Sequence, residues 1–281
     1  MNTRTLCFPG FRHKALTLNY DDGCYFDEEF IRKMQQRGIK GTFNLCGSWM
    51  KDGERFGRHL SLQEAQALYQ PAGMEVACHG YRHLAMAEYP AAQLLEDALR
   101  DRQEAEKHFE GPIFGFAYAQ GSFNDDAVEA LRLCGFHYSR TCVVTRDFSL
   151  PKDWLRMPTT CKHQDPRLFE LADEFLKERG GNYFWRAPNR PRWFTVWGHS
   201  YEFNDCNEWD LIERFMDKVG GREDVWYCTT GEMYDYVTAF DRLEYSADGK
   251  IILNRSNLDV YLELPDWSLV MVPAGGKVCL E

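Results

Sequence analysis

Short apolar runs alternate along the chain with segments whose apolar residues repeat at a helical period. The run ALTLNY from Ala15 is bounded by polar residues and is typical of a buried strand. The segment FDEEFIRKMQQRG that follows carries its apolar residues on one helical face, and Gly38 ends it. The same alternation continues to about residue 240. This order predicts an α/β protein with a largely parallel sheet.

Three of the predicted helices begin with capping signals. Ser61 opens a capping box, Asn124 or Asp125 caps a later helix, and Asp165 precedes a proline at the first helical position of another. These signals favour true helix starts over loops. The remaining strands are predicted at 41–46, 74–79, 113–119, 136–144, 193–200 and 225–230, and the remaining helices at 61–70, 91–109, 124–135, 165–181, 208–221 and 232–240.

After about Asp241 the pattern changes to strands alone. RLEYSADGKIILNR pairs two alternating runs across Asp248 and Gly249, which is a strong hairpin signal, and LDVYLEL and SLVMVPAGGKVCL continue it. We therefore predict a main domain over residues 1–240 and a small antiparallel β unit over 241–281, packed on it. No internal repeat or low-complexity linker separates the two.

The charge of the chain limits its partners. A formal net charge of -10 repels phosphate backbones, and no run of Lys or Arg offsets it locally. Nucleic acid is therefore not an expected partner. The composition, with 44% hydrophobic and 15% aromatic residues, is that of a globular protein, and the aromatic side chains suit either a core or a sugar-stacking site. The oligomeric state is left open.

No apolar stretch is long enough to span a bilayer, and MNTRTLCFPGFRHK lacks the apolar centre of a secretory signal. We therefore expect a cytoplasmic protein that binds no membrane. The 10 cysteines run from Cys7 to Cys279 without a CxxC pair, and several, including Cys46, lie in or beside apolar runs. They are expected to be free, mostly structural thiols.

Polar residues suited to catalysis stand at the ends of several predicted strands. Asp21 and Asp22 follow the first long strand, His79 closes MEVACH, and His199 closes TVWGH. In α/β sheets and barrels, functional groups gather at the carboxyl ends of the strands. These four side chains are therefore candidates for a single site.

Three of the candidates suit a metal ion. His79 and His83 are four residues apart, and with Asp22 they would form a site of two imidazoles and one carboxylate that leaves positions open for water and substrate. A hydrolytic Zn²⁺ in such a site lowers the pKa of water toward roughly 7. The alternative is a chance HxxxH pair, which is frequent in a chain with 8 histidines.

Asp21 and His199 complete the chemistry. Asp21 is free to accept a proton from the water that the metal activates, and His199 is placed to protonate the leaving group. In the alternative interpretation the two acids cap the following helix and His199 is an ordinary core histidine.

The motifs TLNYDDG from Thr17, HGYRH from His79 and WGH ending at His199 occur in this order on the expected strand ends. In these stretches the sequence resembles the polysaccharide deacetylases, carbohydrate esterase family four, as a divergent member. The resemblance covers roughly residues 15–199 and implies a distorted (β/α) barrel. It also implies the site roles: Asp21 as general base, His199 as general acid, and Asp22, His79 and His83 as metal ligands.

The implied activity is that of a metal-dependent deacetylase, a hydrolase of non-peptide carbon–nitrogen amide bonds. It would remove an N-acetyl or, less often, an O-acetyl group from a carbohydrate, an oligosaccharide or sugar conjugate. Zinc is the expected ion, with cobalt, nickel and iron as alternatives that accept the same ligands. Two other functions stay open: hydrolysis of small cyclic amides or ureides on the same fold, and metal-retaining carbohydrate binding without catalysis.

The sequence departs from the family at its third motif. Where the family has an arginine that orients the base, the segment AYAQG has Ala117. Either the enzyme is inactive or another strand supplies the cation, and Arg140 in HYSRT is the nearest candidate. The alternative for Arg140 is a surface salt bridge.

Smaller departures follow. Gly80 stands where the family has serine or threonine, the fourth motif is read into Asp153 with Trp154, and His163 is either a cleft residue or, as the safer interpretation, a surface residue. Aromatic residues near the strand ends would suit stacking on a pyranose ring, although a core role is equally open to each. They are Trp49, Tyr118, Trp154, Trp197 and Tyr201, of which Tyr118, Trp154 and Trp197 are the predicted substrate-binding residues.

Overall fold

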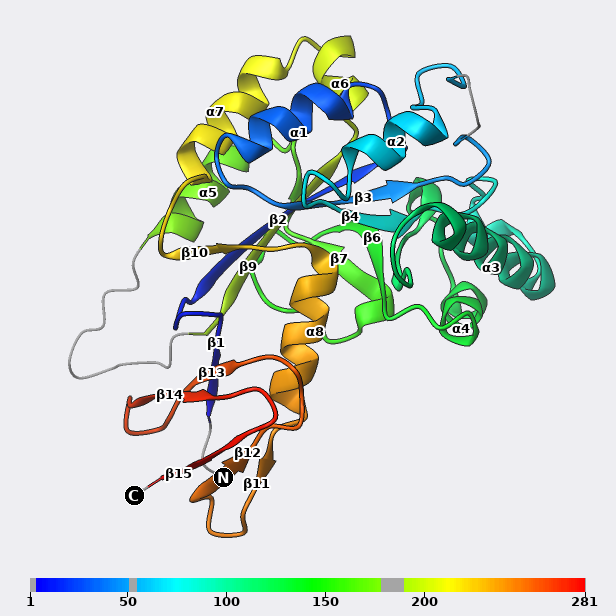
Figure 1. Cartoon of the computed structure of the whole chain (residues 1–281). Helices are drawn as coiled ribbons and strands as arrows, with labels where there is room; N and C mark the ends of the chain where they lie inside the picture. Colours follow the sequence, from blue (N-terminus) through cyan, green and yellow to red (C-terminus); the bar gives the residue numbers. More distant parts are fainter. Residues whose placement is uncertain (1–3, 51–54, 178–189, 281) are drawn as a thin grey trace.

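The computed structural model describes residues 4–50, 55–177 and 190–280, and its centre is a sheet of parallel strands surrounded by helices (Figure 1). The strands of this sheet are β2 (Lys14–Asp21), β3 (Gly41–Leu45), β4 (Glu75–Cys78), β5 (Gly115–Ala117), β6 (Tyr138–Val144), β7 (Met157–Thr159), β8 (Cys161–Lys162), β9 (Arg192–Gly198) and β10 (Val225–Tyr227). The helices are α1 (Asp27–Gln35), α2 (Leu62–Leu68), α3 (Ala91–His108), α4 (Asp125–Leu133), α5 (Leu168–Leu176), α6 (Ser200–Asp205), α7 (Trp209–Val219) and α8 (Thr230–Asp241), with 3-10 turns η1 (Met86–Glu88), η2 (Ala119–Gly121) and η3 (Trp154–Arg156).

The parallel sheet nearly closes on itself. Its strands follow the order β7-β6-β5-β4-β3-β2-β9-β8, and β10 pairs with β2 beside this path. Only Thr160 separates β7 from β8, so the two ends of the path are adjacent in the chain, and Thr160 N donates to Thr195 O on β9. The predicted distorted (β/α) barrel is therefore confirmed.

The two faces of the strands have different chemistry. In β2, Leu16 and Leu18 belong to the apolar cluster shared with the helices, whereas Asn19 and Asp21 have polar partners from other strands. Because successive side chains alternate across a strand, one set packs outward against the helices and the other lines the interior. The barrel thus has an apolar outer shell and a polar interior that leads to the strand ends.

The helices surround the barrel in two groups (Figure 1). Helices α1, α5, α6 and α7 lie on one side and α3 with α4 on another, while α8 leads from the barrel to the small sheets. The capping predictions hold for two of them: Ser61 makes a capping box at α2, and Asn124 accepts a hydrogen bond from Ala127 N at α4.

The predicted start of the α5 helix is wrong. The helix begins at Leu168, because Asp165 Oδ1 accepts a bond from Arg167 N in a separate turn and its Oδ2 accepts one from Arg146. The carboxylate is thus engaged before the helix starts, and it does not cap the helix. The predicted end of this helix, over 178–181, lies outside the described residues.

The remaining strands form two small antiparallel sheets at the end of α8 (Figure 1). One sheet has the order β11-β12-β15 and includes the predicted hairpin across Asp248 and Gly249; the other has the order β1-β13-β14. Strand β1 comes from the start of the chain, so the second sheet joins both ends of the sequence. The division at residue 240 stays a prediction. The strands are β1 (Thr5–Cys7), β11 (Glu244–Tyr245), β12 (Ile251–Leu253), β13 (Val260–Glu263), β14 (Leu269–Val272) and β15 (Lys277–Cys279).

All ten cysteines are free thiols, as expected. Among the residues that the structure describes, no helix combines the length and the apolar character that a membrane span needs.

Candidate functional site

Asp21 is held from two sides at the end of β2. Asn44 Nδ2 donates to its Oδ1 at 2.8 Å, and Arg140 Nη2 donates to its Oδ2 at 2.5 Å. Burial alone would raise the pKa of this carboxyl, but the charges of Arg140, His79 and His199 and the Asn44 hydrogen bond hold the pKa below its usual value. Asp21 is therefore a fixed and ionised carboxylate.

Arg140 is the cation that fixes Asp21. Its side chain is fully buried, its Nε donates to Asn19 Oδ1 at 2.9 Å, and its guanidinium lies over the Trp197 ring, 4.9 Å from the centroid. In the parallel register of β5 and β6, Arg140 stands directly beside Ala117. The surface salt bridge considered for Arg140 is excluded, and the arginine reaches the acid from the strand next to Ala117.

Asp22 points elsewhere, toward two imidazoles. Its Oδ1 lies 3.6 Å from His79 Nε2 and 3.6 Å from His83 Nε2, and this buried oxygen has no hydrogen-bond partner. Burial raises the pKa of Asp22 to about 6. A buried carboxylate oxygen without a donor needs a positive partner, which a cation between these three groups would supply.

The backbone after β2 turns sharply to aim the two acids in different directions. Asp22 has φ 78° and Gly23 has φ 62°, so the left-handed turn that glycine favours follows the acid pair directly. Helix α1 starts later, with Phe26 at its N-cap position and no side-chain cap. The interpretation in which the acids cap this helix is therefore wrong.

His79 and His83 each offer a ring nitrogen that could bind a metal ion. His79 Nδ1 lies 2.8 Å from Ala117 O, and because a carbonyl only accepts, Nδ1 carries the proton and Nε2 offers its lone pair. Burial lowers the pKa of His79 to about 4, so the ring is neutral. His83 stacks on Trp49 with 4.8 Å between ring centroids. Both imidazoles thus present Nε2 to the same carboxylate oxygen.

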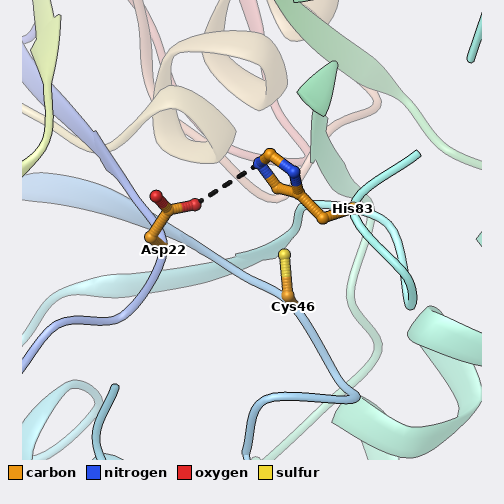
Figure 2. A group of neighbouring side chains, drawn as sticks. All are labelled: Asp22, Cys46 and His83. Atoms are coloured by element: carbon orange, nitrogen blue, oxygen red, sulfur yellow. Dashed lines mark ion pairs between the residues drawn. The ribbon is translucent and has the colours of Figure 1, made fainter. Parts of the chain in front are cut away.

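Cys46 is a site residue that the sequence analysis missed, because it was grouped with the structural thiols. Ligand atoms of Asp22, Cys46 and His83 all lie within 4.8 Å of one another, and Figure 2 shows the sulfur and the imidazole on the same side of the carboxylate. The available signal was its position: Cys46 follows β3 directly, as His79 follows β4. A donor set of nitrogen, oxygen and sulfur fits a divalent transition-metal ion.

His199 lies on the other side of the acids. Its Nε2 is 4.0 Å from Asp21 Oδ2 and 3.8 Å from Asp22 Oδ2, and its Nδ1 is 3.2 Å from Glu202 Oε2. Burial alone would lower the pKa of His199, but Glu202 and the two aspartates raise it. Burial opposes ionisation of Glu202 too, yet His199 and Lys162 lower its pKa to about 2. Glu202 thus favours the protonated form of His199, and this carboxylate was not among the predicted site residues, although its i,i+3 spacing from His199 was visible in the sequence.

Helix α3 anchors the loops that carry the imidazoles and the thiol. Asp101 accepts hydrogen bonds from Gly47 N at 2.7 Å and His79 N at 3.0 Å, and one helical turn away Asp97 accepts from Arg82 N and Nε. Gly80 has φ 83°, and a Cβ on it would lie 3.3 Å from Asp97 Oδ2. This pair of buried acids supports the loop at the point where the family's serine or threonine is missing.

Two predicted substrate-binding residues lie elsewhere. Tyr118 is fully buried, donates its hydroxyl to Leu155 O and stacks on Phe123, so it has no surface for a sugar. Trp154 packs against Trp193 and Tyr234 before β7, at the opposite end of the strands from the site. Both predictions are therefore wrong, because Tyr118 packs into the apolar cluster shared with the helices and Trp154 into the cluster at the other end of the barrel.

The neighbouring Asp153 caps the turn η3 and pairs with Arg156, so the fourth motif read into Asp153 and Trp154 lies away from the candidate site. His163 is fully buried and stacked on Tyr20, which makes both the cleft and the surface interpretations wrong.

Three other aromatic residues remain beside the site. Trp197 is half-buried and lies 6.0 Å from His199 between ring centroids, and Tyr201 stacks on His199 at 4.9 Å. Trp49 covers His83. Of the aromatic residues proposed from the sequence, these three lie beside the candidate site.

Comparisons with known proteins agree with the barrel fold. The sequence model described as polysaccharide deacetylase matches residues 10–139. A candidate polysaccharide deacetylase from Mycobacterium smegmatis superposes with a TM-score of 0.58 at 15% identity, over 86% of this chain and 96% of that one. The Xyl-CE4 domain of a multidomain xylanase from the hindgut metagenome of Trinervitermes trinervoides gives 0.54 at 14% identity, over 84% and 99%.

A third structure, a CE4 family pseudoenzyme from Bacillus anthracis, gives a TM-score of 0.51 at 15% identity, over 82% of this chain and 68% of that chain. No curated protein matches the chain in sequence. The chain is thus similar to the polysaccharide deacetylases over residues 10–139, and it shares the barrel fold of these solved structures.

Proposed function

We propose that this protein is a metal-dependent hydrolase that removes acetyl groups, in the first place N-acetyl groups, from a carbohydrate. The observation that carries the proposal is the Arg140–Asp21 ion pair. It supplies a fixed carboxylate base beside Asp22, whose unpartnered oxygen points at two imidazoles.

Asp22, His79 and His83 would hold the metal ion, for which zinc is the proposed identity. A divalent ion bound there lowers the pKa of water toward roughly 7 and polarises the acetyl carbonyl. The neutral state of His79 and its Nδ1 hydrogen bond to Ala117 O keep the Nε2 lone pair available for this role.

The other residues move protons. Asp21 accepts a proton from the attacking water, and Arg140 and Asn44 keep its two oxygens in place while it does so. His199, held by Glu202, donates a proton to the leaving amine nitrogen. Each such proton transfer contributes typically 10²–10⁴-fold to the rate.

The proposed substrate is an acetylated oligosaccharide or sugar conjugate. Trp49, Trp197 and Tyr201 surround the acid–base groups and offer aromatic faces for a sugar ring. A xylanase-associated domain among the structural relatives supports a carbohydrate substrate.

One structural relative is a pseudoenzyme, and a mutant of it has restored enzymatic activity. The missing third-motif arginine would suggest that this chain is inactive too. The buried Arg140–Asp21 pair favours an active enzyme instead, because the base keeps its cation from another strand.

Turnover of zinc-loaded protein on acetylated chito-oligomers, compared with a panel of cyclic amides, tests the proposal. Asp21→Asn should lower the rate of acetate release by about 10²–10⁴-fold and retain stoichiometric metal. Glu75→Gln is the matched control, since Glu75 is a half-buried acid at the opposite end of the strands. If metal-loaded wild type releases no product from any amide or ester, the alternative of carbohydrate binding without catalysis is favoured. If it turns over cyclic amides alone, the substrate is a small cyclic amide and not an acetylated carbohydrate.

A further inference from the structure

Cys46 lies against the proposed metal ligands without a structural task that requires sulfur. Its side chain is fully buried at the end of β3, and Sγ has His79 O as a weak partner at 3.7 Å. Sγ and ligand atoms of Asp22 and His83 lie within 4.8 Å of one another.

Asp22 Oδ1 gives a second, independent observation. It is buried, belongs to a side chain that is 9% exposed, and has no hydrogen-bond partner, although it faces His79 and His83 at 3.6 Å. An orphaned carboxylate oxygen between two imidazoles and a thiol marks the place of a cation.

We propose that Cys46 Sγ is a fourth protein ligand of the metal ion, beside Asp22, His79 and His83. The inference rests on the proposed function, because it concerns the same ion. When the divalent cation binds, the S–H bond breaks, its proton passes to solvent, and the thiolate forms a sulfur–metal bond.

A sulfur ligand narrows the class of metal that the site accepts. Carboxylate and imidazole alone serve many divalent ions, whereas thiolate favours zinc and other thiophilic ions over magnesium, calcium and manganese. Catalytic zinc sites sometimes expand to five-coordinate, and the water that the proposed function requires would take this fifth position. The site thus selects a thiophilic cation, a property that the aspartate and histidines alone do not supply.

The neighbouring strand provides a matched control. Cys78 is equally buried at the end of β4, but it lies outside the cluster of Asp22, Cys46 and His83. A Cys78→Ser variant therefore removes a buried thiol directly before His79 and leaves all four proposed ligands in the chain.

Cobalt reports sulfur ligation without any measurement of activity. Wild type and Cys78→Ser, loaded with one equivalent of Co²⁺, should show a near-ultraviolet sulfur-to-cobalt charge-transfer band together with the visible ligand-field bands. Cys46→Ser should keep the visible bands and lose the charge-transfer band, and its zinc affinity should fall at least about tenfold.

X-ray absorption of zinc-loaded wild type tests the same point without a variant, in case Cys46→Ser fails to fold. One sulfur at about 2.3 Å from zinc is the expected result. A first shell of nitrogen and oxygen only would overturn the inference, and so would a charge-transfer band that survives in Cys46→Ser. If zinc has only nitrogen and oxygen ligands and the protein still releases acetate, the proposed function stands without the sulfur ligand. A wild type that binds neither zinc nor cobalt would overturn the proposed function and the inference together.

Discussion

Arg140 and Ala117 stand side by side in the parallel register of β6 and β5, and the guanidinium of Arg140 pairs with Asp21. The family's base-orienting arginine belongs at the position of Ala117. Side chains in register on neighbouring parallel strands face the same way, so an arginine on β6 reaches nearly the same space as one on β5. The cation has therefore moved one strand along the barrel while its contact with the base is kept.

This relocation predicts a loss and a rescue. Arg140→Gln should lower turnover by about 10²-fold or more, because Asp21 loses the cation that orients it. Zinc binding should stay intact, because Arg140 does not pair with the proposed ligand Asp22. Breaking a buried pair should also destabilise the fold by roughly 3–5 kcal/mol, measured by denaturant unfolding.

In an Arg140→Ala background, Ala117→Arg should restore a large part of the lost activity, measured as kcat on the same substrate. If the double variant is as inactive as Arg140→Ala while both are folded and metal-loaded, Arg140 does not replace the arginine expected at position 117.

Glu202 should set the alkaline limb of the pH–rate profile. The carboxylate beside Nδ1 raises the pKa of His199, and His199 must be protonated to act as the acid. Glu202→Gln removes this effect, so the pKa of His199 falls and activity should be lost at lower pH than in wild type. The measurement is kcat/KM from pH 5 to 10, and an unchanged alkaline limb would show that another group controls it.

Asp101 should contribute to metal affinity from a distance. Its carboxylate bonds the backbone of Gly47 and of His79, and an amide keeps only one acceptor oxygen for these two donors. Asp101→Asn should therefore weaken zinc binding by roughly 10–100-fold in a competition titration with a chelator. Glu75→Gln replaces a half-buried acid at the other end of the strands, and its zinc affinity should stay at the wild-type value. An equal loss of zinc affinity in both variants would mean that general destabilisation, and not the support of the loops by Asp101, causes the effect.

Gly198 is required by steric contact and not by its backbone angles. A Cβ at this position would lie 2.0 Å from Nδ1 of the buried His163 ring, which stacks on Tyr20. Gly198→Ala should destabilise the protein by about 1–3 kcal/mol and, because His199 is the next residue, lower turnover as well. Thermal unfolding and kcat of the purified variant measure the two effects, and a wild-type melting temperature would mean that His163 moves aside at no cost.

The sequence alone determined the order of elements and the location of the main chemical groups. The alternation of apolar runs with helical segments is a local property, and it predicted the barrel strands β2, β3, β4, β5, β6, β9 and β10. The short strands β7 and β8 were not predicted, because neither is long enough to show a pattern of its own. The positions of Asp21, Asp22, His79 and His199 at strand ends followed from the same alternation. Parallel strands bring their carboxyl ends to one edge, so these residues converge without any further information.

Only the tertiary structure decided which side chains face the site. The pairing of Ala117 with Arg140 brings Arg140 to Asp21, whereas Tyr118, one residue later, packs into the apolar cluster, and such register is fixed by pairing between strands. Trp154 lies in the turn η3 and packs against Trp193. Cys46 could not be recognised from the sequence because its neighbours in space, Asp22 and His83, are distant in the chain. The contact of Glu202 with His199 depends on the direction in which α6 leaves β9. The sequence thus contained the reacting groups, and the closure of the barrel selected the residues that hold them.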